Sequence, residues 1–282
     1  MRWPHYEHIF FDCDSTLSTI EGIDILAEFA GKKDAVEALT KAAMEGELGL
    51  EDVYAKRLAA ITPTHEQIRH IRSAYKHHIV EDSAEIVTLL QELGHKVYII
   101  SGGLYEPVAE FGVSLGVPRE RIRAVKLEYD QLSGHWWDTQ NGAADNANYL
   151  DFDASPLTIS DGKALIVRQL LGEQTGRSLL IGDGSSDLLA SRAVDLFVGF
   201  GGVETRQPVL DAAPVFIHST SLAPLIALAA GPVALLKLLD TQHQRLAQKA
   251  CHLIDEGALT FNNERLSEKF QRAYQVIHSR SG

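Results

Sequence analysis

Residues 8–16 read HIFFDCDST, so a short apolar run stops abruptly at Asp12 and a polar segment begins. An apolar run of this length with polar neighbours is typical of a buried strand that leads into a loop. In open sheets covered by helices, the functional loops follow the carboxyl ends of the strands. We therefore expect Asp12 and Asp14 to lie at the edge of such a sheet.

Helical and strand-like patterns alternate along the chain after residue 80. We predict helices at 84–93, from residue 106, at 162–171 and at 186–192, and strands at 96–100, 122–125, 178–181 and 196–198. Such alternation produces a mostly parallel sheet with helices on both faces. The sequence therefore predicts an α/β fold with a doubly wound sheet.

Three segments depart from this alternation. Residues 20–79 have a helical pattern without a recognisable strand. Residues 126–157 hold LEY at 127–129 and WW at 136–137 on either side of SG at 133–134, which predicts a hairpin over the site or at the edge of the sheet. Residues 140–148 should form a loop.

The C-terminal part of the chain is expected to be helical. The apolar segment 222–236 is shorter than the roughly 20 residues of a membrane span, and we interpret it as two packed helices that meet at Gly231 and Pro232. Further helices are expected at 233–256 and 263–278, separated by Gly257.

Composition excludes several classes of protein. The formal net charge of −12 repels nucleic acids and anionic membranes, and no run of lysine and arginine offsets it locally. Two cysteines, Cys13 and Cys251, are too few for a disulfide framework or a four-ligand zinc site. The N-terminus lacks an apolar signal core. We expect a cytoplasmic protein, either a monomer or a homodimer, that binds no nucleic acid or membrane.

The pair Asp12 and Asp14 can divide the work of phosphoryl transfer. One carboxylate can attack phosphorus while the other handles the proton of the leaving oxygen. The pair alone is weak evidence, because two aspartates in this spacing also occur in turns as solvated capping residues.

A second acidic segment, GDGSSD at 182–187, also follows an apolar run. Its glycines allow a tight turn that directs Asp183 and Asp187 toward the same sheet edge as Asp12 and Asp14. Because gathered carboxylates repel one another, we expect a hard dication among them. Magnesium suits a few carboxylates with water and a phosphate oxygen. Calcium storage fits less well, since the ligands come from separate loops.

Two further segments offer groups that bind anions. SGG at 101–103 follows a predicted strand and provides a hydroxyl and amide donors beside a helix, although these letters are common in turns. Lys163 begins a predicted helix and would neutralise a transferring phosphoryl group. Taken alone, a lysine there is more often a solvated helix residue.

Together, these segments resemble the motifs of the haloacid dehalogenase superfamily, and most closely its phosphoserine phosphatase branch. The four segments, in family order, are FFDCDSTL at 10–17, SGG at 101–103, GK at 162–163 and GDGSSD at 182–187. The resemblance covers about residues 6–228. It implies a catalytic core at 1–18 and 80–230 and a small helical-bundle cap at 19–79. Residues 231–282 are expected to form a helical extension outside the resemblance.

The resemblance also implies roles for these residues. Asp12 would be the nucleophile and Asp14 the general acid and base, while Lys163, Ser101 and Gly102 would bind the phosphoryl group. Magnesium would be held by the carboxylates of Asp12 and Asp183 and by the backbone carbonyl of Asp14, with Asp187 as a ligand or in the outer shell. Arg206 would buttress the magnesium loop.

Substrate recognition is implied by two residues of the helical insertion. Glu21 resembles the family's glutamate that meets the substrate ammonium, and Arg57 resembles its carboxylate-binding arginine, whose fork suits a carboxylate. Each has a structural alternative: a glutamate near a helix start favours the dipole, and an arginine on a helix is usually solvated. Together they predict a small phosphorylated amino acid as substrate.

The leading prediction is hydrolysis of O-phosphoserine to serine and phosphate with Mg²⁺. Leu50 stands where the family usually has phenylalanine, and Ser186 where asparagine is common. These departures keep open a phosphatase or phosphotransferase for another small phosphomonoester. A non-catalytic phosphate-binding protein is the remaining alternative, but it would not need both a nucleophile and a proton shuttle.

Overall fold

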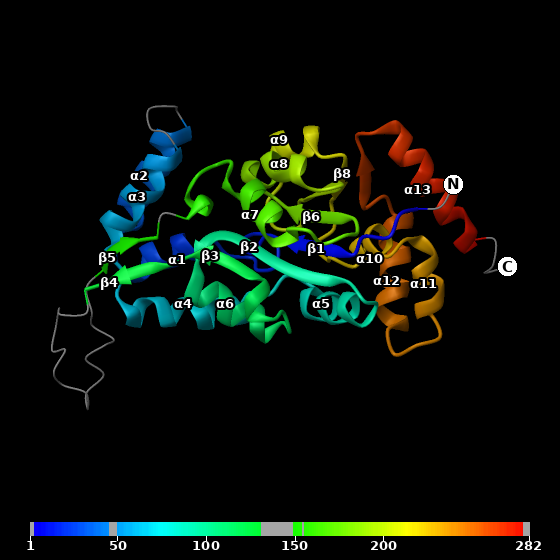
Figure 1. Cartoon of the computed structure of the whole chain (residues 1–282), viewed down its shortest axis with the longest axis horizontal. Helices are drawn as coiled ribbons and strands as arrows, with labels where there is room; N and C mark the ends of the chain where they lie inside the picture. Colours follow the sequence, from blue (N-terminus) through cyan, green and yellow to red (C-terminus); the bar gives the residue numbers. More distant parts are fainter. Residues whose placement is uncertain (1–2, 45–49, 131–148, 154, 279–282) are drawn as a thin grey trace.

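The computed structural model describes residues 3–44, 50–130, 149–153 and 155–278. In this part of the chain, a seven-stranded sheet has the order β3-β2-β1-β6-β7-β8-β9 (Figure 1). Pairs from β3 to β8 are parallel, and β9 is antiparallel to β8. The predicted mostly parallel sheet is confirmed.

The elements have the following bounds. The strands are β1 (His8–Phe11), β2 (Lys96–Leu104), β3 (Ile122–Val125), β4 (Leu127–Tyr129), β5 (Tyr149–Phe152), β6 (Ser178–Gly182), β7 (Leu196–Phe200), β8 (Val215–Ile217) and β9 (Leu259–Phe261). The α-helices are α1 (Gly22–Phe29), α2 (Lys33–Met44), α3 (Leu50–Ile61), α4 (His65–His77), α5 (Ser83–Glu92), α6 (Tyr105–Ser114), α7 (Gly162–Leu171), α8 (Ser185–Ala190), α9 (Gln207–Ala212), α10 (Leu225–Ala229), α11 (Pro232–Leu238), α12 (Gln244–Asp255) and α13 (Glu264–His278).

Helices cover both faces of the sheet, as a doubly wound fold requires. Because successive strand residues point to opposite faces, Ile9 and Phe11 of β1 pack in one apolar core and Phe10 packs in the other. Residues of α5 and α6 belong to the first core and residues of α7, α8 and α9 to the second, and Figure 1 shows the two groups of helices on either side of the sheet.

The described part of segment 20–79 is helical, as predicted, and its strand-like pairing is limited to an isolated bridge between Ser18 and Ile79. Helix α4 begins with a capping box, in which Thr64 accepts a hydrogen bond from the Gln67 backbone and Gln67 accepts one from that of Thr64. Helices α1 to α4 gather beyond one end of the sheet (Figure 1). Their delimitation as a separate cap stays a prediction.

A small two-stranded sheet, β4 with β5, lies against these helices. The ring of Phe152 in β5 packs edge to face on that of Tyr54 in α3, with 5.3 Å between the ring centroids. Tyr129 of β4 stacks on His65 at the start of α4. The predicted turn at 133–134, the tryptophans at 136–137 and the loop at 140–148 lie outside the described residues.

The prediction of a wholly helical C-terminal segment was wrong at β9, which extends the main sheet beside β8. Both strands are three residues long, too short to carry a recognisable period, and β8 was not predicted either. The helix expected at 233–256 is divided into α11 and α12. Gly231 does separate α10 from α11, with a φ of 88° that favours glycine.

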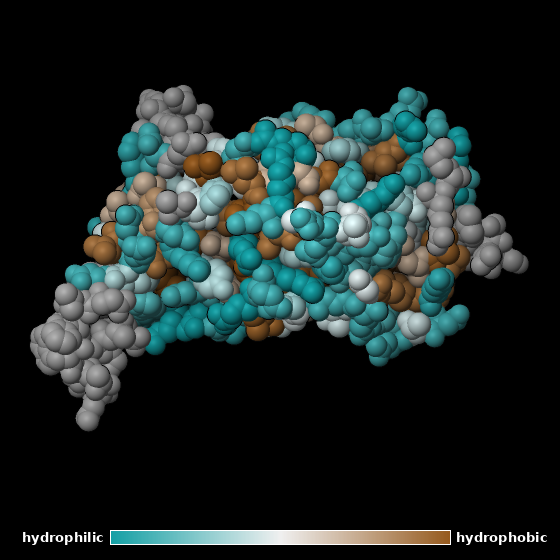
Figure 2. Space-filling model, viewed as in Figure 1, coloured by the Kyte–Doolittle hydropathy of each residue, from teal (hydrophilic) through white to brown (hydrophobic). Residues whose placement is uncertain are grey.

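The surface is mostly polar on the face shown in Figure 2, where hydrophobic residues form scattered patches. Among the described residues, no helix has both the length and the apolar character needed to cross a bilayer.

Candidate active site

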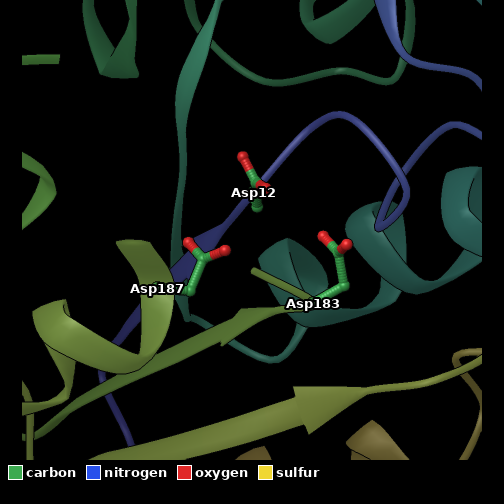
Figure 3. Close-up of side chains that lie close together, drawn as sticks. All are labelled: Asp12, Asp183 and Asp187. Carbon is green, nitrogen blue, oxygen red and sulfur yellow. The ribbon is translucent and has the colours of Figure 1, made fainter. Parts of the chain in front are cut away.

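Three aspartates meet at the carboxyl ends of β1 and β6. Asp12 directly follows β1, Asp183 follows β6, and Asp187 lies in the first turn of α8. The backbone N–H of Asp12 donates to the carbonyl of Ile181 at 2.9 Å, because the two strands are parallel neighbours. All three side chains are buried, and one oxygen of each lies within 4.8 Å of the others (Figure 3).

Lys163 joins this cluster from the first turn of α7. Its Nζ lies 2.8 Å from Oδ1 of Asp12 and 2.7 Å from Oδ1 of Asp187, and the residue is only 5% exposed. Burial alone would lower the pKa of Lys163, but the charges of Asp12 and Asp187 outweigh it and raise the pKa. Gly162 lets the start of α7 lie close to the backbone of the preceding segment, since a Cβ there would lie 1.5 Å from the Pro156 carbonyl oxygen.

Asp14 is held by three hydrogen bonds beside the cluster. Tyr75 and the backbone N–H of Gly22 donate to its Oδ1 at 2.5 and 2.9 Å, and the Ser101 hydroxyl donates to Oδ2 at 3.3 Å. Burial, reinforced by the charge of Asp12, raises the pKa of Asp14 to about 6, although the hydrogen bonds from Tyr75 and Gly22 oppose the shift. Asp14 can therefore exchange a proton near neutral pH.

The SGG segment forms the irregular end of β2, which is longer than predicted and reaches Leu104. Its pairing with β3 shifts register between Ile100 and Leu104. Ser101 is completely buried and accepts a hydrogen bond from the Gly103 N–H at 2.8 Å, whereas Gly102 and Gly103 line the cavity described below. A Cβ on Gly103 would lie 2.8 Å from Oδ2 of Asp14, so the close approach needs glycine.

Arg206 fixes the second acidic loop. Its Nε donates to Oδ2 of Asp183 at 2.9 Å, and its Nη2 lies 2.7 Å from Glu204 and 3.5 Å from Glu21. The hydroxyl of Thr16 donates to the other oxygen of Asp183 at 3.3 Å. Arg206 therefore contacts the proposed metal loop, as expected from the sequence.

One cavity of about 280 Å³ brings most of the predicted site residues together. Glu21 lines it and accepts a hydrogen bond from Ser15 at 2.8 Å, and burial raises the pKa of Glu21 to about 8. Arg57 lines it too, with Nη2 donating to Thr40 at 2.6 Å. The side chain of Leu50 is outside the part of the chain whose side chains are described. The lining residues are Asp12, Asp14, Glu21, Ile23, Tyr54, Arg57, Gly102, Gly103, Leu104, Leu157, Ile159, Lys163, Asp183, Gly184, Ser185, Ser186 and Arg206.

Two tyrosines near the site were not predicted. Tyr54 lines the cavity and precedes Arg57 by three residues, so the shared helix face was a signal that could have identified it. Tyr75 has no such signal, because its partner Asp14 is 61 residues away. Ser101 and Asp187 do not line the cavity themselves but contact residues that do.

The acidic cluster fits a magnesium ion. Its donors are carboxylate oxygens, which suit a hard dication. Burial and the charge of Asp12 raise the pKa of Asp183, and the same causes raise that of Asp187 to about 8. In their ionised forms the three aspartates outnumber their two cationic neighbours, Lys163 and Arg206, and a dication would offset the remaining negative charge.

Comparison with known proteins agrees with this geometry. A model of haloacid dehalogenase-like hydrolases matches residues 6–195, which include all four segments of the site. Phosphoserine phosphatases of Mus musculus and Homo sapiens are each 34% identical to this chain, over 74% of it and 88% of their own length.

Solved structures show the same fold. A phospho-aspartyl intermediate analogue of phosphoserine phosphatase has a TM-score of 0.64 and 23% identity, over 79% of this chain and 98% of its own. A phosphoserine phosphohydrolase-like protein from Francisella tularensis has a TM-score of 0.63 and 26% identity, over 78% of this chain and 99% of its own.

Proposed function

The chain belongs to the haloacid dehalogenase-like hydrolases, and from this premise we propose that it hydrolyses O-phosphoserine to serine and phosphate through phosphorylated Asp12. The observation that carries the proposal is the convergence of a nucleophile, a proton carrier and a cation in one cavity. Asp12 contacts Lys163 at 2.8 Å, and Asp14, whose pKa is near neutral, lines the same cavity.

In the first step, an oxygen of Asp12 attacks phosphorus and forms an acyl phosphate while the phosphorus–oxygen bond to serine breaks. Asp14, in its protonated form, donates its proton to the leaving serine oxygen. Lys163 offsets charge on the phosphoryl oxygens, and Gly102 and Gly103 line the same cavity.

In the second step, Asp14 takes a proton from water, and the water oxygen attacks phosphorus. The bond between phosphorus and Asp12 breaks, which releases inorganic phosphate and restores the carboxylate.

We propose that Mg²⁺ is held by the carboxylates of Asp12 and Asp183 and the backbone carbonyl of Asp14, with Asp187 behind them. Asp12 and Asp183 line the cavity, whereas Asp187 is fully buried and bonded to Lys163 and to the Gly184 N–H. When bound, the ion would neutralise charge on the phosphoryl group and on the carboxylates around it.

The serine part of the substrate would meet the residues supplied by the helical segment. Glu21 would bind the ammonium group and Arg57 the carboxylate, since both line the cavity that holds Asp12 and Asp14. Ile23, Leu157 and Ile159 add apolar walls.

A phosphate-release assay with Mg²⁺ tests the proposal, using O-phosphoserine, O-phosphothreonine, phosphoethanolamine and sugar phosphates. We expect the highest kcat/KM with O-phosphoserine. Faster turnover of another ester would identify that ester as the substrate in place of O-phosphoserine. If an alcohol is present and ester is consumed without release of a matching amount of phosphate, the protein is a phosphotransferase. Binding without any turnover would favour the phosphate-binding alternative.

A further inference from the structure

Two hydrogen-bond donors of helix α3 are buried at the cavity without a partner. The hydroxyl of Tyr54 and the Nε of Arg57 are inaccessible to solvent and make no hydrogen bond with any described residue. They lie three positions apart on the helix, so they share one face of it, and both residues line the cavity. Buried polar groups normally have partners, so this pair needs an explanation.

Both side chains are held in place by neighbours that leave these donors unpaired. Nη2 of Arg57 donates to the Thr40 hydroxyl at 2.6 Å, and that hydroxyl in turn donates to the Val36 carbonyl at 2.9 Å. The ring of Tyr54 packs edge to face on that of Phe152, and the ring centroids are 5.3 Å apart. Among the residues that the structure describes, no carboxylate forms an ion pair with Arg57.

The phenol of Tyr54 acts here as a donor. Burial, and next the negative charge of Asp14, raise the pKa of Tyr54, so the hydroxyl keeps its proton at neutral pH. Helix α3 therefore contributes one neutral and one cationic side chain to the wall of the cavity. A carboxylate complements this pair, because its two oxygens accept several hydrogen bonds and its charge matches the arginine.

The phosphoryl end of the cavity is formed by other elements. Asp12, Lys163 and Gly102 come from the carboxyl edge of the sheet and the helix start beside it, whereas Tyr54 and Arg57 both come from α3. We therefore expect the side chains of α3 to meet a group of the substrate other than the one that reacts.

We propose that the Tyr54 hydroxyl is a second donor, next to Arg57, to the carboxylate of the substrate, which makes Tyr54 a specificity-determining residue. This inference rests on the proposed function and extends it: the pocket selects phosphorylated amino acids over phosphorylated amines of similar size. The small sheet β4–β5 contributes through Phe152, which positions the Tyr54 ring.

The test compares Tyr54→Phe with the wild type on O-phosphoserine and on phosphoethanolamine, which lacks the carboxylate. We expect KM for O-phosphoserine to rise about tenfold, as loss of one hydrogen bond to a charged group implies. The value of kcat for O-phosphoserine and kcat/KM for phosphoethanolamine should stay within about twofold. Melting should occur at the same temperature or higher, because the change removes an unpaired buried hydroxyl.

Tyr129→Phe is the matched control. Its hydroxyl is also buried without a partner among the described residues, but Tyr129 lies in β4 and does not line the cavity. We expect this variant to keep wild-type kinetics on both esters.

The outcomes separate the two proposals. Turnover of O-phosphoserine by the wild type, with no change or an equal loss on both esters in Tyr54→Phe, overturns the role of Tyr54 and leaves the proposed function standing. Failure of the wild type to hydrolyse O-phosphoserine overturns both. A double variant that combines Tyr54→Phe with Arg57→Ala adds a check. Because both side chains would donate to one carboxylate, the double variant should lose less kcat/KM for O-phosphoserine than the product of the two separate losses.

Discussion

The hydroxyl of Tyr75 donates a 2.5 Å hydrogen bond to Oδ1 of Asp14, and thereby joins helix α4 to the loop after β1. The first residue of α1, Gly22, donates its N–H to the same oxygen. No side chain could replace glycine there without displacing the phenol, since a Cβ would lie 2.3 Å from the Tyr75 oxygen. Two helices of the predicted cap therefore position the proposed acid and base.

Tyr75→Phe should raise the pKa of Asp14 above its value of about 6, because it removes a hydrogen bond that favours the charged form. In our mechanism, kcat/KM reports the formation of phosphorylated Asp12, which needs Asp14 protonated. The rate therefore falls as pH rises through this pKa, and the variant should move the fall to higher pH. A kcat/KM profile from about pH 5 to pH 9 measures the shift.

Tyr274→Phe provides the control for that profile. It also removes a buried tyrosine hydroxyl, but one that donates to the Cys251 carbonyl in the C-terminal helices. Its pH profile should match that of the wild type. An unchanged profile in Tyr75→Phe would contradict the positioning role.

Asp12→Asn should abolish turnover, with kcat reduced at least about a thousandfold, because an amide oxygen is a poor nucleophile for phosphorus. When the wild type is quenched with acid during turnover of O-phosphoserine that is radiolabelled at phosphorus, label should remain on the protein. No label should remain on the variant. Asp240→Asn, at an exposed position, should label as the wild type does. Equal labelling of Asp12→Asn would refute Asp12 as the nucleophile.

Mg²⁺ should stabilise the wild type against heat. A ligand that binds only the folded state at a hundred times its Kd adds about 2.7 kcal/mol to the free energy of unfolding, which raises Tm by several degrees in a chain of this size. Asp183→Asn should lose most of this rise, and chelation should reverse it in the wild type. A rise in Asp183→Asn as large as in Asp240→Asn would exclude Asp183 as a ligand.

His95 should make the fold less stable in mild acid. Its Nδ1 donates to the Tyr6 carbonyl, its Nε2 is buried without a partner among the described residues, and burial lowers its pKa. The unfolded chain, with a histidine pKa of about 6.5, then binds the proton more readily. The free energy of unfolding should therefore decrease as pH falls through about 6.5.

Urea unfolding at several pH values, with wild type and His95→Gln, measures this contribution. In the variant, the free energy of unfolding should fall less steeply as the pH is lowered. The difference in slope should correspond to at most one proton taken up on unfolding. The same slope in both proteins would show that His95 does not carry the effect.

Several features of the fold were predictable because their signals are local. The strand before Asp12 and the helix at 162–171 were identified from apolar runs and periods that span a few neighbouring residues. Strands β8 and β9 were missed, since three residues do not define a period and their pairing depends on chain segments far apart.

The sequence by itself predicted which side chains would carry the proposed chemistry: Asp12, Asp14, Lys163 and Asp183 stand in short segments whose order is recognisable without coordinates. Only the tertiary structure decided what surrounds them. The bond from Tyr75 that holds Asp14 and the unpaired hydroxyl of Tyr54 arise where helices meet loops distant in the chain. Burial and hydrogen-bond partners are properties of such long-range contacts, and no local pattern of residues encodes them.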